Sequence, residues 1–318
     1  MKRTQRRILC AFAAVTVVLL IVLTIGSFFM LDFALRPTPN DGKDVTACYA
    51  GVKRDYPWIT PWLDSLSTAE ALRDTFIVNP DGIRLHALYV RADRLTDHTA
   101  VIVHGYTDSS VRMLMIGYLY HRRLGYNILL PDLQNCGLSG GDAIQMGWKD
   151  RLDVMQWMQV ANATFGGHTR MVVHGISMGA ATTMMVAGES NPNYVRCYVE
   201  DCGYTSVWDQ FGKELGEQFH LPDFPLLYTA SALCKVRYGW SFGEASALAQ
   251  VSKCRLPMLF IHGDADAYVP TWMLYPLYEA KPQPKERWIV PGATHAMSYK
   301  MHPEAYTRRV EKFTKQYN

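Results

Sequence analysis

The stretch MVVHGISMGAATTMM, residues 171–185, decides the fold. An apolar run typical of a buried strand leads directly into Gly175-x-Ser177-x-Gly179, and a helical stretch follows. A sharp turn from strand to helix requires glycines beside the serine, because larger side chains would clash, and it exposes the hydroxyl. Ser177 is therefore either a nucleophile or one small residue in a Gly-rich turn.

Strand-like runs alternate with helical segments on both sides of this stretch. The runs are residues 75–79, 83–90, 100–105, 126–132, 171–175, 195–201, 257–263 and 287–292. This alternation predicts an α/β fold with a mostly parallel sheet covered by helices on both faces. Pro80-Asp81-Gly82 predicts an antiparallel hairpin between the first two runs, so the sheet should be mixed.

Residues 204–245 interrupt the alternation. The segment is rich in aromatic residues and too long for one crossover helix. It is either a helical cap over the carboxyl ends of the strands, where open α/β sheets bind ligands, or an ordinary pair of surface helices. We favour the cap.

The N-terminus has the pattern of a membrane anchor. An uncharged apolar run from Ile8 to Leu31 is long enough to span a hydrocarbon core of ~30 Å. A cleaved signal peptide would have a shorter apolar stretch and a small-x-small cleavage site, neither of which is evident. The basic residues before the run place the N-terminus in the cytoplasm and the rest of the chain outside. They are Lys2, Arg3, Arg6 and Arg7.

The chain thus divides into an anchor (1–35, with the transmembrane helix at 8–31), a linker and aromatic lead-in (36–71), and a catalytic domain (72–318). The net charge of +3 provides no basic face for nucleic acid. The seven cysteines include no Cys-x-x-Cys pair, so we expect small buried residues with at most one disulfide.

A serine nucleophile needs a base, an acid that orients the base, and donors for the oxyanion. The acid should follow a late strand, where Asp264 and Asp266 are candidates and Asp201 is a rival at the end of the preceding strand. We favour Asp266, because two turn residues after Gly263 leave it room to reach the base. Asp264 should instead cap that turn.

The base should come last in chain order, after the final strand. His295 in GATHAMS is the natural choice, whereas His302 opens the last helix and fits a surface position. The oxyanion donors should be the backbone N–H groups of Met178 and Tyr106. His104 should brace the loop that carries Tyr106.

The motifs HGYTD, HGISMGAATTMM, EDCGYTS, FIHGDADAYVP and GATHA, in this order, resemble the α/β-hydrolase superfamily. The closest resemblance is to a bacterial branch of membrane-anchored or secreted hydrolases related to the serine aminopeptidase and prolyl-oligopeptidase-like groups. It covers about residues 72–317 and implies the α/β-hydrolase fold, an eight-stranded type of sheet, and Ser177, Asp266 and His295 as catalytic. One departure is the run 132–139, DLQNCGLS, where many relatives carry an arginine and a histidine.

These patterns predict a serine hydrolase of carboxylic esters, with thioesters possible. The aromatic cap residues Trp208, Phe211 and Phe224 are candidates for binding an apolar part of the substrate. The alternatives are a peptidase or aminopeptidase, for which Glu214 and Glu217 could hold a substrate amine, and a non-catalytic binding protein. We expect no cofactor and no metal, because the sequence has no His-Glu-x-x-His, zinc cysteine pair or nucleotide-binding glycine motif.

Overall fold

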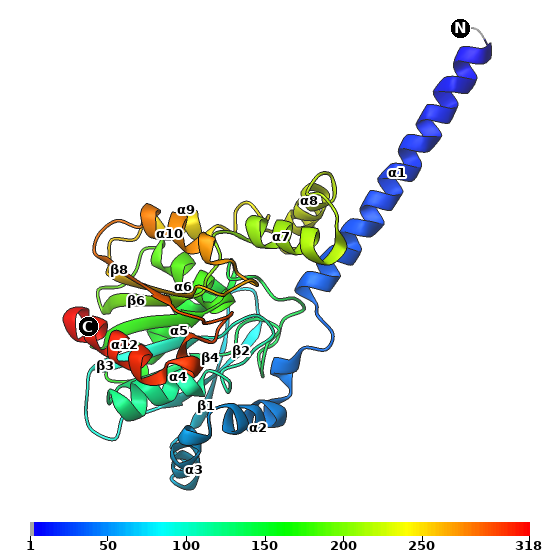
Figure 1. The fold of residues 1–318 in the computed structure, drawn as a ribbon. Helices are drawn as coiled ribbons and strands as arrows, with labels where there is room; N and C mark the ends of the chain where they lie inside the picture. Colours follow the sequence, from blue (N-terminus) through cyan, green and yellow to red (C-terminus); the bar gives the residue numbers. More distant parts are fainter. Residues whose placement is uncertain (1–2) are drawn as a thin grey trace.

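The computed structural model describes residues 3–318 of the chain. Lys2, part of the predicted basic tail, lies outside the described residues, and the side chains of Arg3 and Arg6 are not described either. Within residues 3–318 the secondary structure is one mixed sheet, helices on both of its faces, and a long N-terminal helix that projects away from the rest (Figure 1).

The sheet has eight strands in the described part of the chain, in the order β1-β2-β4-β3-β5-β6-β7-β8. β1 and β2 form the predicted antiparallel hairpin, β2 also pairs antiparallel with β4, and the remaining neighbours are parallel. The mixed, mostly parallel sheet predicted from the sequence is therefore confirmed. The strands are β1 Arg73–Val78, β2 Arg84–Val90, β3 His98–Val103, β4 Asn127–Pro131, β5 Arg170–Ile176, β6 Val195–Asp201, β7 Met258–Gly263 and β8 Lys285–Val290.

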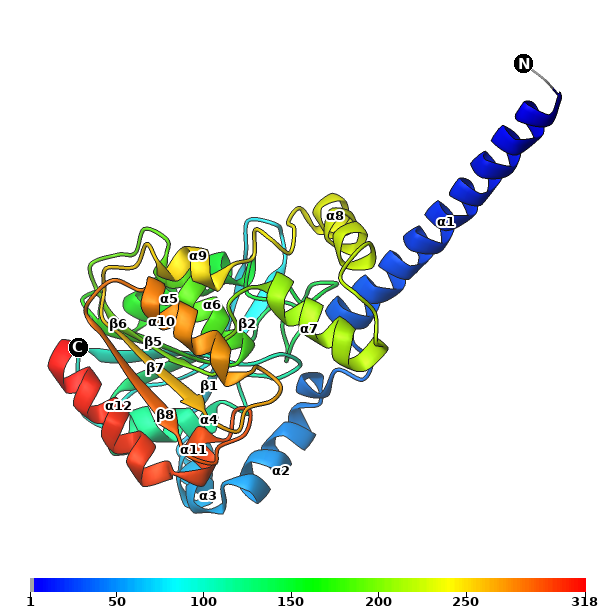
Figure 2. The same ribbon diagram turned by 45° about the horizontal axis from the view of Figure 1, so that its top comes forward.

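Helices cover both faces of this sheet (Figure 2). The α-helices are α1 Arg3–Leu35, α2 Val45–Asp55, α3 Thr60–Thr68, α4 Leu114–Tyr118, α5 Asp150–Thr164, α6 Met178–Ala187, α7 Val207–Phe219, α8 Leu226–Tyr238, α9 Ala247–Val251, α10 Leu274–Ala280, α11 Ser298–Met301 and α12 Pro303–Tyr317. Short helical turns lie at η1 Asp41–Lys43, η2 Pro57–Ile59, η3 Leu119–Arg123 and η4 Thr271–Met273.

Two apolar clusters form the core, one on each face of the sheet. Alternate residues of β3 separate between them: Val101 and Val103 join one cluster, and Ala100 and Ile102 join the other. This follows from the two-residue period of a strand, and full burial of both sets explains why the run reads as continuously apolar. The first cluster also contains side chains of α5, α6 and α10, and the second contains those of α3, α4 and α12.

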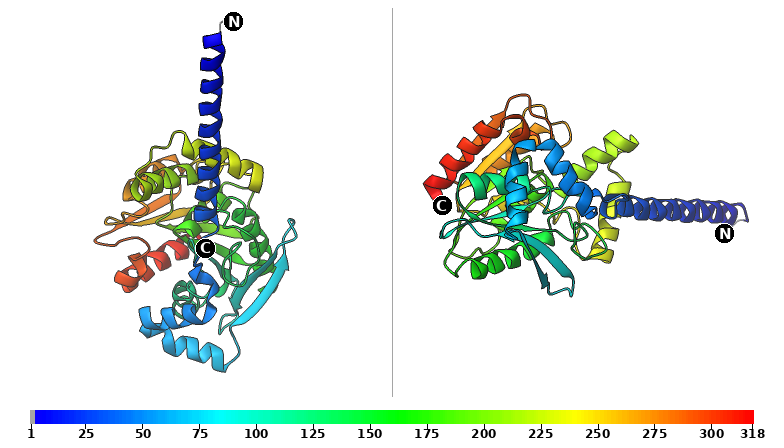
Figure 3. Two further views of the ribbon diagram at one scale, coloured as in Figure 1. Left: turned by 90° about the vertical axis from the view of Figure 1, so that its right-hand side faces the viewer. Right: turned by 90° about the horizontal axis from the view of Figure 1, so that it is seen from below.

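The segment predicted as a cap contains helices α7 and α8, which lie together beside α1 (Figure 3). It follows β6 and ends before α9. An isolated antiparallel bridge between Ser206 and Ser246 joins its two ends. Ser206 also caps α7, since its side chain accepts a hydrogen bond from the N–H of Asp209 at 3.0 Å.

Helix α1 is longer than the predicted membrane segment. The stretch Arg7–Leu35 has the length and composition of a membrane-spanning helix or of an N-terminal signal sequence. Its C-terminal part is not free: Ser27, Leu31 and Leu35 are buried against the rest of the protein.

The region predicted as a linker and lead-in contains α2 and α3, which the sequence pattern did not predict as helices. The aromatic lead-in packs on the domain through Trp62, Leu63 and Leu66. All seven cysteines, each among the described residues, are free thiols; Cys10 is exposed and the other six are buried.

Candidate active site

Ser177 occupies a strained turn between β5 and α6. Its backbone has φ 57° and ψ −120°, a conformation that costs free energy for a residue with a side chain. A Cβ on Gly175 would lie 2.0 Å from the carbonyl oxygen of Gly179, and a Cβ on Gly179 would lie 2.1 Å from that of Val103. Both glycines of the Gly-x-Ser-x-Gly pattern are thus required by backbone contacts, as the sequence suggested.

A chain of hydrogen bonds connects Ser177 to an acid through a histidine. Ser177 Oγ lies 2.8 Å from His295 Nε2, and His295 Nδ1 lies 2.8 Å from Asp266 Oδ2. A carboxylate can only accept, so Nδ1 carries the proton that it donates to Asp266. In the neutral ring Nε2 is then left free to accept from the Ser177 hydroxyl. The arrangement can pass the serine proton to the imidazole.

Asp266 lies in the loop after β7, and its side chain is fully buried. Backbone N–H groups of Tyr268 and Val269 donate to Oδ1 at 3.0 and 2.9 Å, which leaves Oδ2 for the histidine. Burial raises the pKa of Asp266, but hydrogen bonds with His262 and His295 outweigh it and lower that pKa to about 2. The carboxyl group is therefore an anion beside His295 across the neutral pH range.

The residues considered as alternative acids and bases make other hydrogen bonds. Asp264 accepts a hydrogen bond at 2.6 Å from the N–H of Gly292, so it links its loop to the loop after β8 and does not cap its own turn as expected. Asp201 is buried and accepts from the hydroxyl of Ser298 at 3.2 Å. Burial raises its pKa to about 6. His302 precedes α12 and points its Nε2 at the carbonyl oxygen of Pro291.

The two predicted oxyanion donors flank the serine. Met178 is the first residue of α6, so its N–H has no acceptor in its own helix. The loop after β3 approaches closely, since a Cβ on Gly105 would lie 3.9 Å from Ser177 Oγ, and Tyr106 follows. His104 braces this loop: its Nδ1 lies 2.7 Å from the carbonyl oxygen of Gly105, and its Nε2 accepts from the N–H of Leu133 at 2.9 Å.

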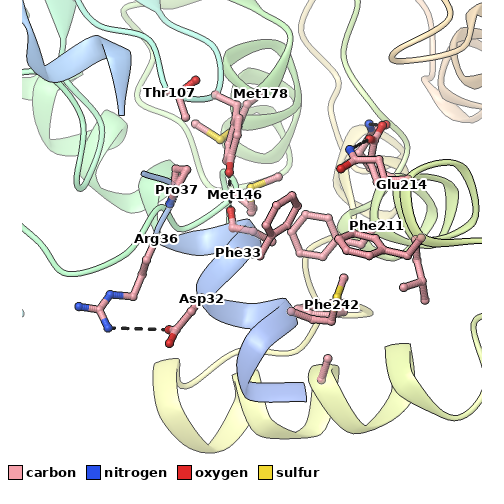
Figure 4. A pocket seen from close by; sticks show the side chains of 18 of the residues that line it. Asp32, Phe33, Arg36, Pro37, Thr107, Met146, Met178, Phe211, Glu214 and Phe242 are labelled. Carbon is pink, nitrogen blue, oxygen red and sulfur yellow. Dashed lines mark hydrogen bonds and ion pairs between the residues drawn. The ribbon is translucent and has the colours of Figure 1, made fainter. Parts of the chain in front are cut away.

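Ser177 opens into a cavity of about 580 Å³ lined mainly by apolar side chains (Figure 4). Its volume lies within the ~300–1,000 Å³ typical of small-molecule sites. Of the three predicted cap residues, Phe211 lines the cavity. Trp208 and Phe224 are not part of the lining and pack instead against Tyr228, with ring centroids 4.8 and 5.7 Å away.

The sequence pattern missed one wall of the cavity. Phe29, Met30 and Phe33 of α1 line it, as does Tyr268, whose ring centroid lies 4.9 Å from that of His295. Within a uniformly apolar run, no residue signals that it faces a pocket. Asp32, directly after that run, is charged, and this charge indicates that the helix is no longer in apolar surroundings at that point.

In residues 132–139, where many relatives carry an arginine and a histidine, Asp132 is paired with a histidine from another part of the chain, His86 of β2. Its Nδ1 lies 2.6 Å from Asp132 Oδ2, and its Nε2 lies 2.9 Å from Asp74. Asp132 also accepts from the N–H groups of Ser110 and Leu138 at 2.6 and 2.9 Å. Burial works against the charged carboxylate, but these partners lower its pKa.

Among residues 3–318, one group of side chains has the spacing of a metal site: Cys202, Asp266 and His295, whose ligand atoms lie within 4.8 Å of one another. Burial raises the pKa of the Cys202 thiol well above its usual range. A thiol binds a metal as the thiolate, so Cys202 would have to lose its proton to act as a ligand. Two members of this group already bond each other.

Glu214 and Glu217, the acidic pair considered for an amine-binding site, differ in whether they line the cavity. Glu214 lines the cavity, and Glu217 does not. The ammonium of Lys213 lies 3.0 Å from Glu214 and 2.7 Å from Glu217, so both carboxylates already have a cationic partner.

Comparison with known proteins agrees with this architecture. Residues 141–318 match the model of the prolyl oligopeptidase family. The uncharacterized protein YqkD of Bacillus subtilis is 31% identical over 252 residues, which cover 79% of this chain and 82% of YqkD. The uncharacterized protein YfhR of Escherichia coli (strain K12) is 22% identical over 243 residues, 73% of this chain and 77% of YfhR.

Solved structures with low sequence identity share the fold. The Pyrococcus furiosus esterase Pf2001 superposes with a TM-score of 0.62 at 23% identity, covering 77% of this chain and 92% of that one. An α/β serine hydrolase homologue from Coxiella burnetii superposes with a TM-score of 0.54 at 16% identity, covering 75% and 96%. The resemblance drawn from the sequence motifs is confirmed. The chain belongs to the prolyl oligopeptidase family, a family of serine hydrolases with the α/β-hydrolase fold.

Proposed function

We propose that this protein is an esterase in which Ser177 is the nucleophile, His295 the general base and Asp266 the residue that orients the base. The observation that carries the proposal is the hydrogen-bonded series from Ser177 Oγ through His295 to the ionised Asp266, at 2.8 Å for each link. Nothing else in the described residues places a base within hydrogen-bonding distance of this strained serine.

The reaction proceeds in two acyl-transfer steps. Ser177 Oγ attacks the ester carbonyl carbon while its proton passes to His295 Nε2. The N–H groups of Tyr106 and Met178 donate to the oxyanion of the tetrahedral intermediate. His295 then gives the proton to the leaving alcohol. Water, activated by the same nitrogen, attacks the acyl-enzyme, releases the carboxylic acid and restores the Ser177 hydroxyl.

The apolar cavity supports an ester rather than an amine-bearing substrate. An aminopeptidase needs carboxylates that are free to bind the substrate ammonium, and Lys213 is paired with both Glu214 and Glu217. Thioesters are compatible with the same chemistry, because their carbonyl carbon is attacked in the same way. A peptidase or aminopeptidase is the second candidate, and the match to the prolyl oligopeptidase family supports peptidase activity.

We also propose that α1 anchors the enzyme in a membrane, with its N-terminus in the cytoplasm and residues 72–318 on the outer face as the catalytic domain. The apolar length of Arg7–Leu35 supports the anchor, and the basic residues before the run support the orientation. A reporter enzyme that works only outside the cytoplasm should be active when it is fused at the C-terminus.

Substrate class is tested by comparing carboxylic esters with aminoacyl amides that share the same acyl group, using the full-length protein. We expect hydrolysis of the esters and little hydrolysis of the amides. Ser177→Ala should lose the ester activity. Efficient cleavage of the amides, with esters as the poorer substrates, would favour the aminopeptidase.

A further inference from the structure

The C-terminal part of α1 is a wall of the cavity that contains Ser177. Phe29, Phe33 and Ala34 of this helix line the same cavity as Ser177 and Phe211. Figure 4 shows Phe33 of α1 and Phe211 of the cap in this cavity. Phe29 and Phe33 are also 57% and 47% exposed. Because these side chains face both the cavity and the outside, the cavity opens beside α1.

Specific contacts hold α1 in this place. The hydroxyl of Ser27 donates to the hydroxyl of Thr229 in α8 at 2.7 Å. Arg237 near the end of α8 pairs with Asp32 at 2.9 Å. These interactions lie near opposite ends of α8, so the last turns of α1 are fixed along the length of this cap helix.

The free part of α1 matches the thickness of a membrane. Residues 8–25 are apolar, and nearly all of their side chains are exposed, whereas burial begins at Ser27. At ~1.5 Å per residue this free part is about 27 Å long, close to the ~30 Å of a hydrocarbon core. The membrane surface would therefore fall near Gly26, where an added Cβ would lie 3.2 Å from Leu226 at the start of α8.

The cap presents apolar side chains at this level of α1. Leu221 and Phe224, in the connection between α7 and α8, are 44% and 72% exposed, and Tyr228 of α8 is 53% exposed. Exposed aromatic and apolar side chains beside an apolar helix are typical of a surface that rests on the membrane interface. With the hydrocarbon core ending near Gly26, the cavity-lining Phe29 and Phe33 would lie at the level of the lipid headgroups.

We propose that the substrate is an ester of a long acyl chain held in the bilayer, which reaches Ser177 along the part of α1 that carries the cavity-lining and exposed Phe29 and Phe33. This rests on the esterase function proposed above. The acyl chain would contact Phe29 and Phe33, whose rings pack against Phe219 of α7 with centroids 6.4 and 5.3 Å away. Its ester carbonyl would lie at Ser177. Helix α1 then serves both as the anchor and as one side of the binding site.

The route is tested with full-length protein in vesicles of phosphatidylethanolamine and phosphatidylglycerol, using 4-methylumbelliferyl palmitate as the bilayer-held ester and the butyrate as the soluble ester. The palmitate is placed either in the same vesicles as the protein or in separate vesicles. We expect clearly faster hydrolysis when the two share a bilayer, because the substrate then need not cross water. Equal rates in the two arrangements would overturn the proposal.

Two substitutions test the role of α1 as a wall. Ala34→Phe should shorten the cavity and lower the ratio of palmitate to butyrate kcat/KM by about tenfold or more, since even one methylene in an apolar pocket has an effect of this size. The matched control is Ala14→Phe in the free part of the helix, which should leave the ratio unchanged. Phe33→Ala, which removes bulk and cannot overpack, takes away an apolar contact with the long acyl chain and should also lower the ratio.

The outcomes separate the two proposals. If wild-type protein hydrolyses the butyrate while the palmitate ratio is the same in Ala34→Phe, Phe33→Ala and wild type, the lipid substrate is wrong and the esterase stands. If wild-type protein hydrolyses neither ester, the esterase itself is wrong.

Discussion

The phenol of Tyr106 donates a hydrogen bond at 2.7 Å to the carbonyl oxygen of Ala34 in the last turn of α1. Tyr106 is also the residue whose backbone N–H is proposed to bind the oxyanion. Burial raises the pKa of its phenol above the usual range, so the side chain remains a donor. The N-terminal helix and the loop beside Ser177 are therefore joined directly.

Tyr106→Phe should loosen this connection while keeping the backbone N–H. A neutral hydrogen bond contributes about 1 kcal/mol, so we expect KM for long-chain esters to rise several-fold with a smaller change in kcat. Steady-state kinetics with two chain lengths checks this. A fall in kcat of about a thousandfold with unchanged KM would mean that the phenol itself takes part in the chemistry.

Gly179→Ala should abolish activity, because the added Cβ would lie 2.1 Å from the carbonyl oxygen of Val103 and push α6 away from β3. Overpacking of this kind costs about 1–3 kcal/mol and displaces Ser177. Thermal unfolding and ester hydrolysis measure the two effects. Gly243→Ala is the control, since its Cβ would meet nothing within 4 Å. Full activity of Gly179→Ala would show that the turn is not constrained as described.

Asp266→Asn should lower kcat about 10⁴-fold, as an amide cannot hold the imidazole in the required tautomer. Asp201→Asn should keep most of the activity, because Asp201 bonds Ser298 and not His295. Rates on a nitrophenyl ester compare the two variants directly. If only Asp201→Asn were inactive, the acid would be misassigned.

The raised pKa of Glu200 predicts that the stability of the protein depends on pH. This fully buried carboxyl group accepts from the N–H of Gly203 at 3.1 Å, and burial raises its pKa to about 8 from an ordinary 4.5. Between these values the folded protein keeps a proton that the unfolded chain releases. The free energy of unfolding should thus fall as pH rises, by up to ~1.4 kcal/mol per pH unit.

Glu200→Gln removes that loss, so its Tm should exceed that of the wild type at pH 8, with the gain shrinking toward pH 4.5. Thermal unfolding across this range measures it. The exposed Glu279→Gln is the control and should follow the wild type at every pH. A gain from Glu200→Gln that did not vary with pH would contradict the assignment.

The sheet could be predicted because its evidence is local. The parallel strands β3 to β7 are almost completely buried on both faces and read as short apolar runs, whereas the edge strand β8 is only partly buried, and the hairpin has its own turn signal. Helix α2 was missed although Val45, Cys48, Tyr49 and Val52 form a short apolar stripe, because the Pro-, Asn- and Gly-containing stretch before it was interpreted as the start of a linker. Its position depends on contacts with the domain, which a single sequence does not reveal.

The candidate site, like the fold, could be predicted in part from the sequence. Ser177, Asp266 and His295 could be selected because each follows a strand at the carboxyl edge of a parallel sheet, where loops meet. The role of α1 in the cavity could not, because it depends on where a uniformly apolar helix docks. The aromatic residues of the cap were chosen by composition, and composition does not say that Phe211 faces inward while Phe224 is 72% exposed.

The central claim is that Ser177 is an activated nucleophile, and labelling with a fluorophosphonate probe tests it most directly. The full-length protein should be labelled once, with the adduct mapped to the peptide that contains Ser177, and Ser177→Ala should not be labelled. An unlabelled wild-type protein, or equal labelling of wild type and Ser177→Ala, would contradict the account.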